Sequence, residues 1–184
     1  TRRPYGVVGA IISWNYPAIN AMMKVAPALA AGNAIVLKPS SQAPRSALHM
    51  AALALETSLP AGLVSVLAGS ASAGTMMCRH PDVAMLAFTG STAIGKLIAG
   101  IAAEKLVPSI IEAGGKNPIL VCDDVTDLEG LARDAIAECY ANTGQLCVAR
   151  SKIIIPRALA GDLTDALVTA AKALGPGDAR DVAT

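Results

Sequence analysis

The sequence is poor in charged and aromatic residues. Of its 184 residues only 16% are charged and 3% are aromatic, and the formal net charge at pH 7 is +1. So small an excess of positive charge provides no electrostatic attraction to nucleic acid or to an anionic membrane surface. So few aromatic rings leave no stacking platform for unpaired bases. We therefore expect neither nucleic acid nor a membrane among the partners.

Metal-site, disulfide and membrane-span patterns are also missing. The four cysteines form no C-x-x-C pair and are accompanied by only two histidines, a spacing that indicates neither a zinc site nor a disulfide framework. No basic leader with an apolar core opens the chain, and Gly, Pro or charged residues interrupt every apolar run well short of a membrane span. The expectation is a cytoplasmic protein without a bound metal.

What the sequence has in abundance is hydrophobic residues, which make up 53% of the chain. A chain of this length can bury one substantial core. The hydrophobic content is nevertheless high for a free-standing soluble domain of average composition. We therefore expect the chain to bury further surface against other segments or against neighbouring subunits, as part of a homo-oligomer in its full-length form.

Short apolar runs alternate with helical patterns along the whole chain. We predict strands over 6–13, 34–38, 63–67, 83–88, 107–111, 118–122 and 151–155, and helices over 18–31, 45–57, 73–79, from 91 onward, 127–142 and 159–174. Strands that are apolar throughout, rather than alternating, are typical of a parallel sheet covered on both faces by helices. The predicted fold is an open α/β sheet of the Rossmann-like kind, followed by the start of a second α/β unit.

The glycine pair in Glu112-Ala113-Gly114-Gly115-Lys116 is a natural crossover between two units. We place the boundary there, with a first domain over 1–113 and a second over 114–184.

Two candidate catalytic residues stand in glycine-rich surroundings. Cys147 ends the run Asn142-Thr143-Gly144-Gln145-Leu146-Cys147, and Glu112 precedes Gly114-Gly115. A thiolate attacks a carbonyl carbon readily, and a carboxylate brought close by folding can activate water to release a thioester. A lone cysteine is more often a small buried hydrophobe, and a lone glutamate is more often a solvated charge.

The segment from Gly90 to Lys96 nearly matches a phosphate-binding loop of the form G-x-x-x-x-G-K. It follows an apolar strand and opens a helix, where free backbone N–H groups and the helix dipole attract an anion. The next residue is Leu97, however, and a nucleotide hydrolase requires a Ser or Thr hydroxyl there for Mg²⁺. Dinucleotide binding without a metal remains open, as does a plain helix cap formed by Ser91 or Thr92.

Several further motifs occur in a fixed order, and together they carry a family resemblance. They are Pro4-Tyr5-Gly6-Val7-Val8-Gly9, Trp14-Asn15-Tyr16-Pro17, the stretch from Lys24 to Asn33, Val36-Leu37-Lys38-Pro39-Ser40, Phe88-Thr89-Gly90-Ser91-Thr92, Glu112-Ala113-Gly114-Gly115-Lys116 and Gly144-Gln145-Leu146-Cys147. From Pro4 to Thr184 the chain resembles the central part of an NAD(P)-dependent aldehyde dehydrogenase. Asn117-Pro118 and the run from Asn142 to Cys147 are most similar to the succinate-semialdehyde dehydrogenase branch.

The resemblance implies a mechanism and its residues. Cys147 would add to a small aldehyde, and the amide of Asn15 would join the backbone N–H of Cys147 in holding the oxyanion. A hydride would pass to the nicotinamide, and water activated by Glu112 would hydrolyse the thioester to the carboxylate. Lys24 would help to move protons near this base. The alternative for Trp14 and Asn15 is simple punctuation at the end of a strand before Pro17.

The resemblance also implies a cofactor site. Gly90 and Ser91, with Gly95 further along, would receive the dinucleotide pyrophosphate, and Trp14, Asn15 and Ala113 would lie near the cofactor, Ala113 standing where the family usually has Leu against the nicotinamide. Lys38 and Ser41 would meet the adenosine ribose. Because many NAD-preferring members carry Glu at the position of Ser41, its replacement removes repulsion of a 2′-phosphate, and NADP is favoured over NAD. Alternatively, Lys38 binds only ribose hydroxyls and Ser41 merely initiates a turn.

Family members are considerably longer than 184 residues. The expected function is therefore an NAD(P)-dependent aldehyde dehydrogenase or the portion of one that carries the nucleophile. The alternative is a catalytically incomplete fragment that acts only as a dinucleotide-binding or structural piece.

Overall fold

The computed structural model describes residues 1, 3–178, 180 and 181 of the chain. The backbone contacts divide the chain into two compact units, Thr1–Gly114 and Gly115–Thr184. The division falls within the glycine pair that the sequence indicated as a crossover, one residue after the expected boundary. Each unit has its own sheet and its own helices, and each is described by itself.

The first unit is built on a parallel sheet of five strands. These are β1 (Val7–Ile11), β2 (Ala34–Lys38), β3 (Val64–Val66), β4 (Val83–Gly90) and β5 (Ser109–Ala113), in the order β3-β2-β1-β4-β5. The chain proceeds outward from β1 to β3 and then returns to the other side of β1 with β4. The strand order therefore reverses between β1 and β4, and this is the point at which open α/β sheets bind ligands.

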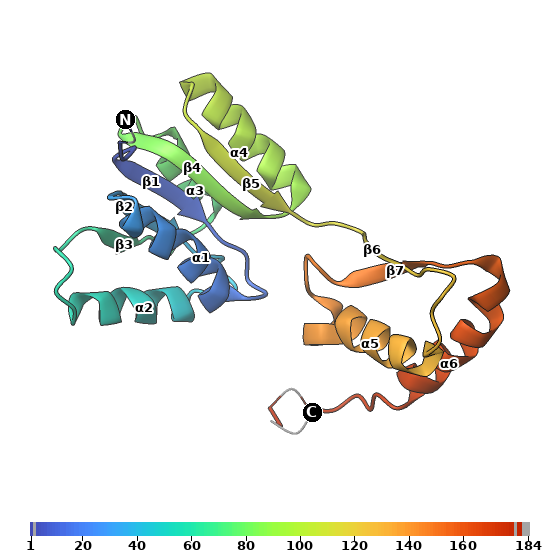
Figure 1. Cartoon of the computed structure of the whole chain (residues 1–184). Helices are drawn as coiled ribbons and strands as arrows, with labels where there is room; N and C mark the ends of the chain where they lie inside the picture. Colours follow the sequence, from blue (N-terminus) through green and yellow to red (C-terminus); the bar gives the residue numbers. More distant parts are fainter. Residues whose placement is uncertain (2, 179, 182–184) are drawn as a thin grey trace. The chain divides into compact units, whose positions relative to one another are not determined.

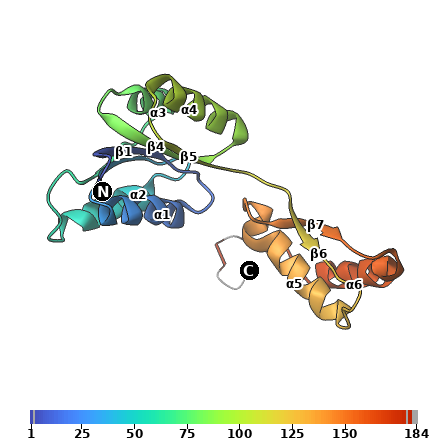
Figure 2. The same ribbon diagram turned by 45° about the horizontal axis from the view of Figure 1, so that its top comes forward.

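Helices cover both faces of this sheet, as predicted, and they enclose two separate clusters of apolar side chains (Figures 1 and 2). On one face lie α1 (Pro17–Ala30) and α2 (Arg45–Leu55), which contribute Val25 and Ala47 to the first cluster. On the other face lie α3 (Ala71–Arg79) and α4 (Thr92–Lys105), which contribute Met77 and Ile98 to the second. Strands buried on both faces explain why their sequences are apolar throughout.

The end of α1 shows how the sequence fixes the first βαβ unit. Gly32 has a φ of +78°, a left-handed conformation that suits glycine, and its N–H donates to the carbonyl of Leu29 at 2.9 Å. The next residue, Asn33, is buried, and its side chain accepts a hydrogen bond from the N–H of Gly6 at 3.1 Å. The end of the helix is therefore tied to the residue that precedes β1.

The second unit has two parallel strands, β6 (Asn117–Leu120) and β7 (Arg150–Ile154), and two helices, α5 (Leu128–Tyr140) and α6 (Ala160–Lys172). Short 3₁₀ turns follow α5 at Ala141–Gly144 and precede α6 at Arg157–Leu159. Helix α5 begins where Asp127 Oδ1 accepts a hydrogen bond from the N–H of Gly130 at 2.7 Å, which satisfies one of the N–H groups left free at a helix start.

The predicted elements are all present, with ends that differ by a few residues. The clearest difference is β5, which was expected to stop at Ile111 and instead continues to Ala113. Glu112 therefore lies in a paired strand, opposite Thr89 of β4, and not in a flexible crossover. Among the described residues no helix combines the length and the apolar content that a bilayer crossing demands. The same residues contain no cluster of His, Cys, Asp and Glu suited to a metal.

Candidate active site

The predicted site residues of the first unit gather at one edge of its sheet. Parallel strands all end at the same edge, and the carboxyl ends of β1, β2, β4 and β5 are followed by or contain Asn15, Lys38, Ser91 and Glu112. Side chains that are far apart in the sequence are thereby brought to the ligand-binding edge of an open α/β sheet. The sequence predicted these residues one by one, and the strand order is what collects them.

Lys24 connects α1 to β4, one of the two strands at the reversal point. Its Nζ donates a hydrogen bond to Thr89 Oγ1 of β4 at 2.8 Å, from its position on the third turn of α1. Burial lowers the pKa of Lys24 from its ordinary value, and the negative charge of Glu112 partly opposes this shift. Lys24 and Glu112 therefore interact electrostatically, while the carboxylate of Glu112 itself lies on an exposed residue. Thr89 was not among the predicted site residues, although it stands beside Gly90 in the sequence.

Lys38 is a buried cation at the end of β2. Only 7% of the residue is exposed, and burial lowers the pKa of its ammonium group. Its stem lies close to α3 at Gly74, where an added Cβ would stand 3.5 Å from Lys38 Cδ. No hydrogen bond from its ammonium group to another described residue is found. The donors of this ammonium group are therefore available to a ligand that supplies acceptor oxygens.

Ser41 lies in an exposed turn between β2 and α2. The N–H of Ala43 donates to the carbonyl of Ser40 at 3.2 Å, so Ser41 and Gln42 occupy the middle of the turn. The turn that the sequence left open as an explanation for Ser41 is thus present. A turn here does not conflict with a ribose contact, because Ser41 is exposed and lies three residues after Lys38 at the end of β2.

Gly90 and Gly95 surround the ring of Phe88, which is 2% exposed. A Cβ added to Gly90 would lie 2.5 Å from Phe88 Cζ, and one added to Gly95 would lie 2.9 Å from Ile111 Cγ2. Gly95 is therefore explained by close packing of α4 on the sheet, which is one of the roles that glycines have in dinucleotide-binding folds. Between them, Ser91 caps α4 by accepting a hydrogen bond from the N–H of Ile94 at 3.4 Å.

Asn15 lies in the loop between β1 and α1 and is oriented by two polar neighbours. Ser13 Oγ donates to Asn15 Oδ1 at 2.8 Å, and Asn20 Nδ2 donates to Ser13 Oγ at 3.0 Å. Trp14, which lies between Ser13 and Asn15 in the sequence, is 43% exposed. Sequence reasoning did not single out Ser13 or Asn20; the signal it could have used is a polar pair flanking Asn15 next to an otherwise apolar strand and helix. Ala113, the last residue of β5, is half-buried.

In the second unit, Cys147 is exposed and lies in the loop between the 3₁₀ turn and β7. The turn is unusual because Asn142 and Thr143 have φ angles of 50° and 55°, followed by Gly144 at 75°. Three successive left-handed residues are costly for the chain, since two of them are not glycine. Such strain persists only where the surrounding structure holds it in place.

Asn117, the first residue of β6, holds this loop. Its Nδ2 donates to the carbonyl of Cys147 at 2.8 Å and to the carbonyl of Ala149 at 3.3 Å. Gly115 leaves room for the arrangement, since a Cβ there would lie 3.2 Å from Asn117 Oδ1. In the sequence, Asn117 contributes only to the family resemblance. In the structure, it holds the backbone carbonyl of the predicted nucleophile.

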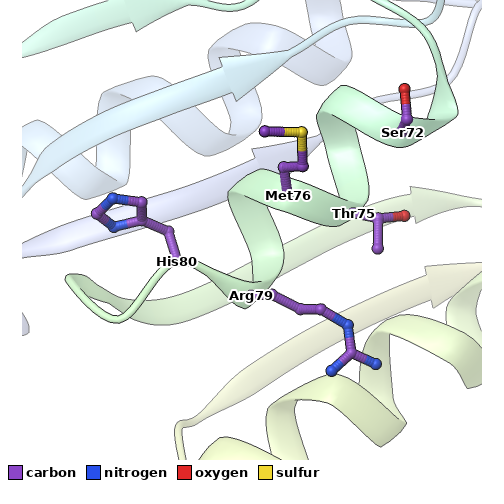
Figure 3. A pocket seen from close by; sticks show the side chains of 5 residues that line it. All are labelled: Ser72, Thr75, Met76, Arg79 and His80. Carbon is purple, nitrogen blue, oxygen red and sulfur yellow. The ribbon is translucent and has the colours of Figure 1, made fainter.

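A surface pocket on the first unit lies apart from these residues. Its lining side chains all come from one face of α3 and the residue that follows it: Ser72, Thr75, Met76, Arg79 and His80 (Figure 3). Gly74, which approaches Lys38, is on the opposite and buried face of that helix. The pocket shares none of its lining residues with the predicted site.

Comparison with known proteins bears on all of these residues together. A sequence model described as "Aldehyde dehydrogenase family" matches residues 1–184. The "Probable betaine aldehyde dehydrogenase" of Schizosaccharomyces pombe is 41% identical over 181 residues, which is 98% of this chain and 36% of the relative. The chain thus spans about a third of the length of the curated relatives that it matches.

Two solved structures are similar in fold and carry a bound dinucleotide. The Mycobacterium tuberculosis aldehyde dehydrogenase complexed with NAD⁺ superposes with a TM-score of 0.91 and 39% identity, over 95% of this chain and 36% of that one. The 3,6-anhydro-L-galactose dehydrogenase, in complex with NADP, superposes with a TM-score of 0.92 and 34% identity, over 99% of this chain and 38% of that one.

Proposed function

Because the chain belongs to the aldehyde dehydrogenase family, we propose that it carries the nucleophile and most of the cofactor-binding edge of an enzyme that oxidises an aldehyde to a carboxylate with NAD(P). The observation that carries the proposal is the gathering of Asn15, Lys38, Thr89 and Glu112 at the carboxyl edge of one parallel sheet. Membership of the family indicates the reaction, and the residues at this edge of the sheet are of the types that the reaction requires.

The dinucleotide would be held by residues whose present surroundings fit it. Lys38, buried and without an acceptor among the described residues, would donate to the ribose, and the N-terminus of α4 after Gly90 would receive the pyrophosphate. Trp14 and Ala113 would lie toward its nicotinamide end. The chemistry that a bound dinucleotide would supply is a hydride acceptor for the oxidation of the aldehyde carbon. Every other chemical role falls to side chains and backbone of the protein itself.

The covalent steps follow from Cys147. By the family resemblance, its thiolate sulfur would form a bond to the aldehyde carbon, and the amide of Asn15 and the backbone N–H of Cys147 would stabilise the charge that develops on the oxygen. After oxidation, a water oxygen attacks the thioester carbon while Glu112 accepts the water proton. The carbon–sulfur bond then breaks, which releases the carboxylate and restores the thiolate. Lys24 interacts electrostatically with this base and, by the family resemblance, would assist its proton exchange.

We propose NADP as the favoured cofactor. The support is local: Ser41 is neutral and exposed where a carboxylate would repel a 2′-phosphate, and Lys38, three residues earlier, is a cation. The finer points remain proposals from the sequence. These are the succinate-semialdehyde branch, assembly as a homo-oligomer and a cytoplasmic location. The Schizosaccharomyces pombe relative and the 3,6-anhydro-L-galactose dehydrogenase are named after other substrates.

The proposal is tested on the native gene product with propanal and either dinucleotide. Iodoacetamide should label Cys147 before Cys122, which is exposed in the same unit and serves as the matched control. Cys147→Ser should lower kcat by at least about 10³-fold, whereas Cys122→Ser should leave it unchanged. Loss of activity on labelling or replacing Cys122 would overturn the assignment. A gene product that binds NADP and oxidises no aldehyde would favour the alternative, an incomplete dinucleotide-binding piece.

A further inference from the structure

Three polar side chains between the end of β1 and the start of α1 form a chain of hydrogen bonds that runs in one direction. Asn20 Nδ2 donates to Ser13 Oγ at 3.0 Å, and Ser13 Oγ donates to Asn15 Oδ1 at 2.8 Å. All three residues are partly buried, so water screens these contacts only in part. This series of hydrogen bonds begins at Asn20 near the start of α1, passes through Ser13 after β1, and ends on the amide of Asn15.

The direction of this chain matters because an amide has two chemically opposite ends. Its nitrogen donates two hydrogen bonds and its oxygen accepts them, and the two ends are almost the same size. An oxyanion is stabilised by the nitrogen end and is repelled by the oxygen end. A side chain that serves this purpose must therefore be prevented from turning over, and contact shape alone cannot prevent it.

Ser13 alone cannot fix the orientation, because a hydroxyl can donate to an amide oxygen or accept from an amide nitrogen. Asn20 resolves this ambiguity. Since its Nδ2 already donates to Ser13 Oγ, the proton of Ser13 is directed toward Asn15, where it requires an acceptor. If Asn15 turned over, two donors would converge on the oxygen of Ser13 and the hydroxyl proton would lose its partner, at the usual cost of an unsatisfied group.

We propose that Ser13 and Asn20 are positioning residues that hold the amide of Asn15 with its nitrogen toward the substrate oxygen. This inference rests on the proposed function, because it deepens the role of Asn15 in that reaction. Neither residue touches substrate or cofactor; both act through Asn15. The series of hydrogen bonds also polarises the amide of Asn15, since each donated bond strengthens the next one along the series.

The decisive variant is Asn20→Asp, which differs from the wild type in one atom and reverses the chain. A carboxylate can only accept, so Ser13 would donate to residue 20 and would then accept from Asn15 Nδ2, leaving Asn15 Oδ1 toward the substrate. We expect kcat for propanal to fall roughly 100-fold, within the range seen when an oxyanion donor is lost. Asn20→Ala removes the constraint without reversing it and should lower kcat by only about tenfold or less.

The second pair of variants isolates the hydroxyl. Ser13→Ala should lower kcat by roughly tenfold, and Ser13→Thr, which retains the hydroxyl, should restore it to within about threefold of the wild type. The KM for NADP should stay the same in all four variants, because none of these residues binds the dinucleotide. A purely structural role for the pair would give equal losses for Asn20→Ala and Asn20→Asp, together with a changed KM for NADP, and would overturn the proposal.

A measurement that needs no activity separates this inference from the proposed function. The chain contains five asparagines, Asn15, Asn20, Asn33, Asn117 and Asn142, so selective ¹⁵N labelling resolves their side-chain amides. Ser13→Ala and Asn20→Asp should shift the Asn15 amide pair strongly and leave that of Asn33 in place. Unchanged Asn15 resonances would overturn the proposal even in an active enzyme. Shifted resonances in a protein that oxidises no aldehyde would retain the hydrogen-bond chain and would instead overturn the function proposed for it.

Discussion

The two units of this chain stabilise their site residues in different ways. In the first, Thr1–Gly114, helices on both faces of a five-stranded sheet enclose two apolar clusters. In the second, Gly115–Thr184, the buried apolar residues among those described are Val121, Ala132, Ala135 and Leu163. The first unit therefore has a core large enough to hold a sheet edge in place, whereas the second relies on few buried side chains.

This difference teaches how each candidate residue is kept in position. Glu112 and Thr89 are paired backbone positions in adjacent strands, so the ladder of the sheet fixes their spacing. Cys147 lies in a loop, after three residues with positive φ, and its carbonyl is held by the side chain of Asn117. The position of the candidate nucleophile therefore depends on a polar contact, whereas the position of the candidate base depends on the sheet.

The largest effect is expected from breaking that polar contact. Asn117→Asp keeps the shape of the side chain, loses both donated hydrogen bonds and places a carboxylate against the carbonyls of Cys147 and Ala149. We expect a loss of about 2–3 kcal/mol in the unfolding free energy of the second unit. Asn117→Ala, which removes the donor without adding repulsion, should lose about 1–2 kcal/mol. Urea unfolding followed by α-helical circular dichroism measures both.

The same variants should loosen the loop around the thiol. Amide exchange over residues 145–149 should accelerate, and iodoacetamide should react faster with Cys147 than in the wild type, while the exposed Cys122 provides the reference rate. Amides in the middle of α6 serve as the control for general unfolding. Equal acceleration in α6 would mean that Asn117 supports the whole unit and not this loop.

The fold could be predicted because its signals are local. Apolar runs such as β1 and β2, the start of α1 at Pro17 and its end at Gly32 are set by neighbours in the sequence, and the predicted ends differ from the observed ones by few residues. Gathering of Asn15, Lys38 and Glu112 at one edge follows from parallel strands in an open sheet. These inferences need periodicity and topology and no side-chain geometry.

The remaining features depend on contacts that the sequence does not encode locally. Asn117 meets the carbonyl of a residue 30 positions later, and Lys24 meets Thr89 across 65 positions. The extension of β5 through Glu112 is imposed by pairing with β4, which overrides the tendency of the following glycines to end the strand. Ser13 and Asn20 are ordinary polar residues until their common partner is known.

A smaller effect should come from two glycines of the same helix, and it sharpens what close packing contributes to the first unit. In α4, a Cβ at Gly95 would approach Ile111 Cγ2 at 2.9 Å, whereas one at Gly100 would meet nothing within 4 Å. Gly95→Ala should therefore lower the unfolding free energy by about 1–2 kcal/mol, the strain outweighing the gain in helix propensity. Gly100→Ala has only the gain and should raise it by about 0.5–1 kcal/mol.

Thermal or urea unfolding measures the stability of both variants, and a titration with NADP measures their cofactor affinity. If Gly95 serves packing, Gly95→Ala should weaken NADP binding only to the extent that the first unit is destabilised. Normal stability combined with weak binding would instead mean that Gly95 approaches the cofactor directly. Destabilisation by Gly100→Ala would show that the outer face of α4 is covered, contrary to its exposure here.

The smallest expected effect is a pH dependence of the unfolding free energy, which arises from Lys24 in the first unit. Burial lowers the pKa of Lys24 in the folded protein below the ordinary value of 10.5. Below the folded pKa both states are charged and the burial cost is fully present; as pH rises toward 10.5 the folded state releases its proton first, so the unfolded state binds more protons and stability rises. The unfolding free energy of the wild type relative to Lys24→Met should therefore increase between neutral pH and about pH 10.

Urea unfolding of both proteins at each pH measures the difference, in which the other titrating groups largely cancel. Glu112→Gln removes the charge that opposes the shift, so it should start this rise at a lower pH. A difference that stays flat or falls with pH would mean that Lys24 is charged in a solvated position, and the first unit would then have no buried cation between α1 and β4.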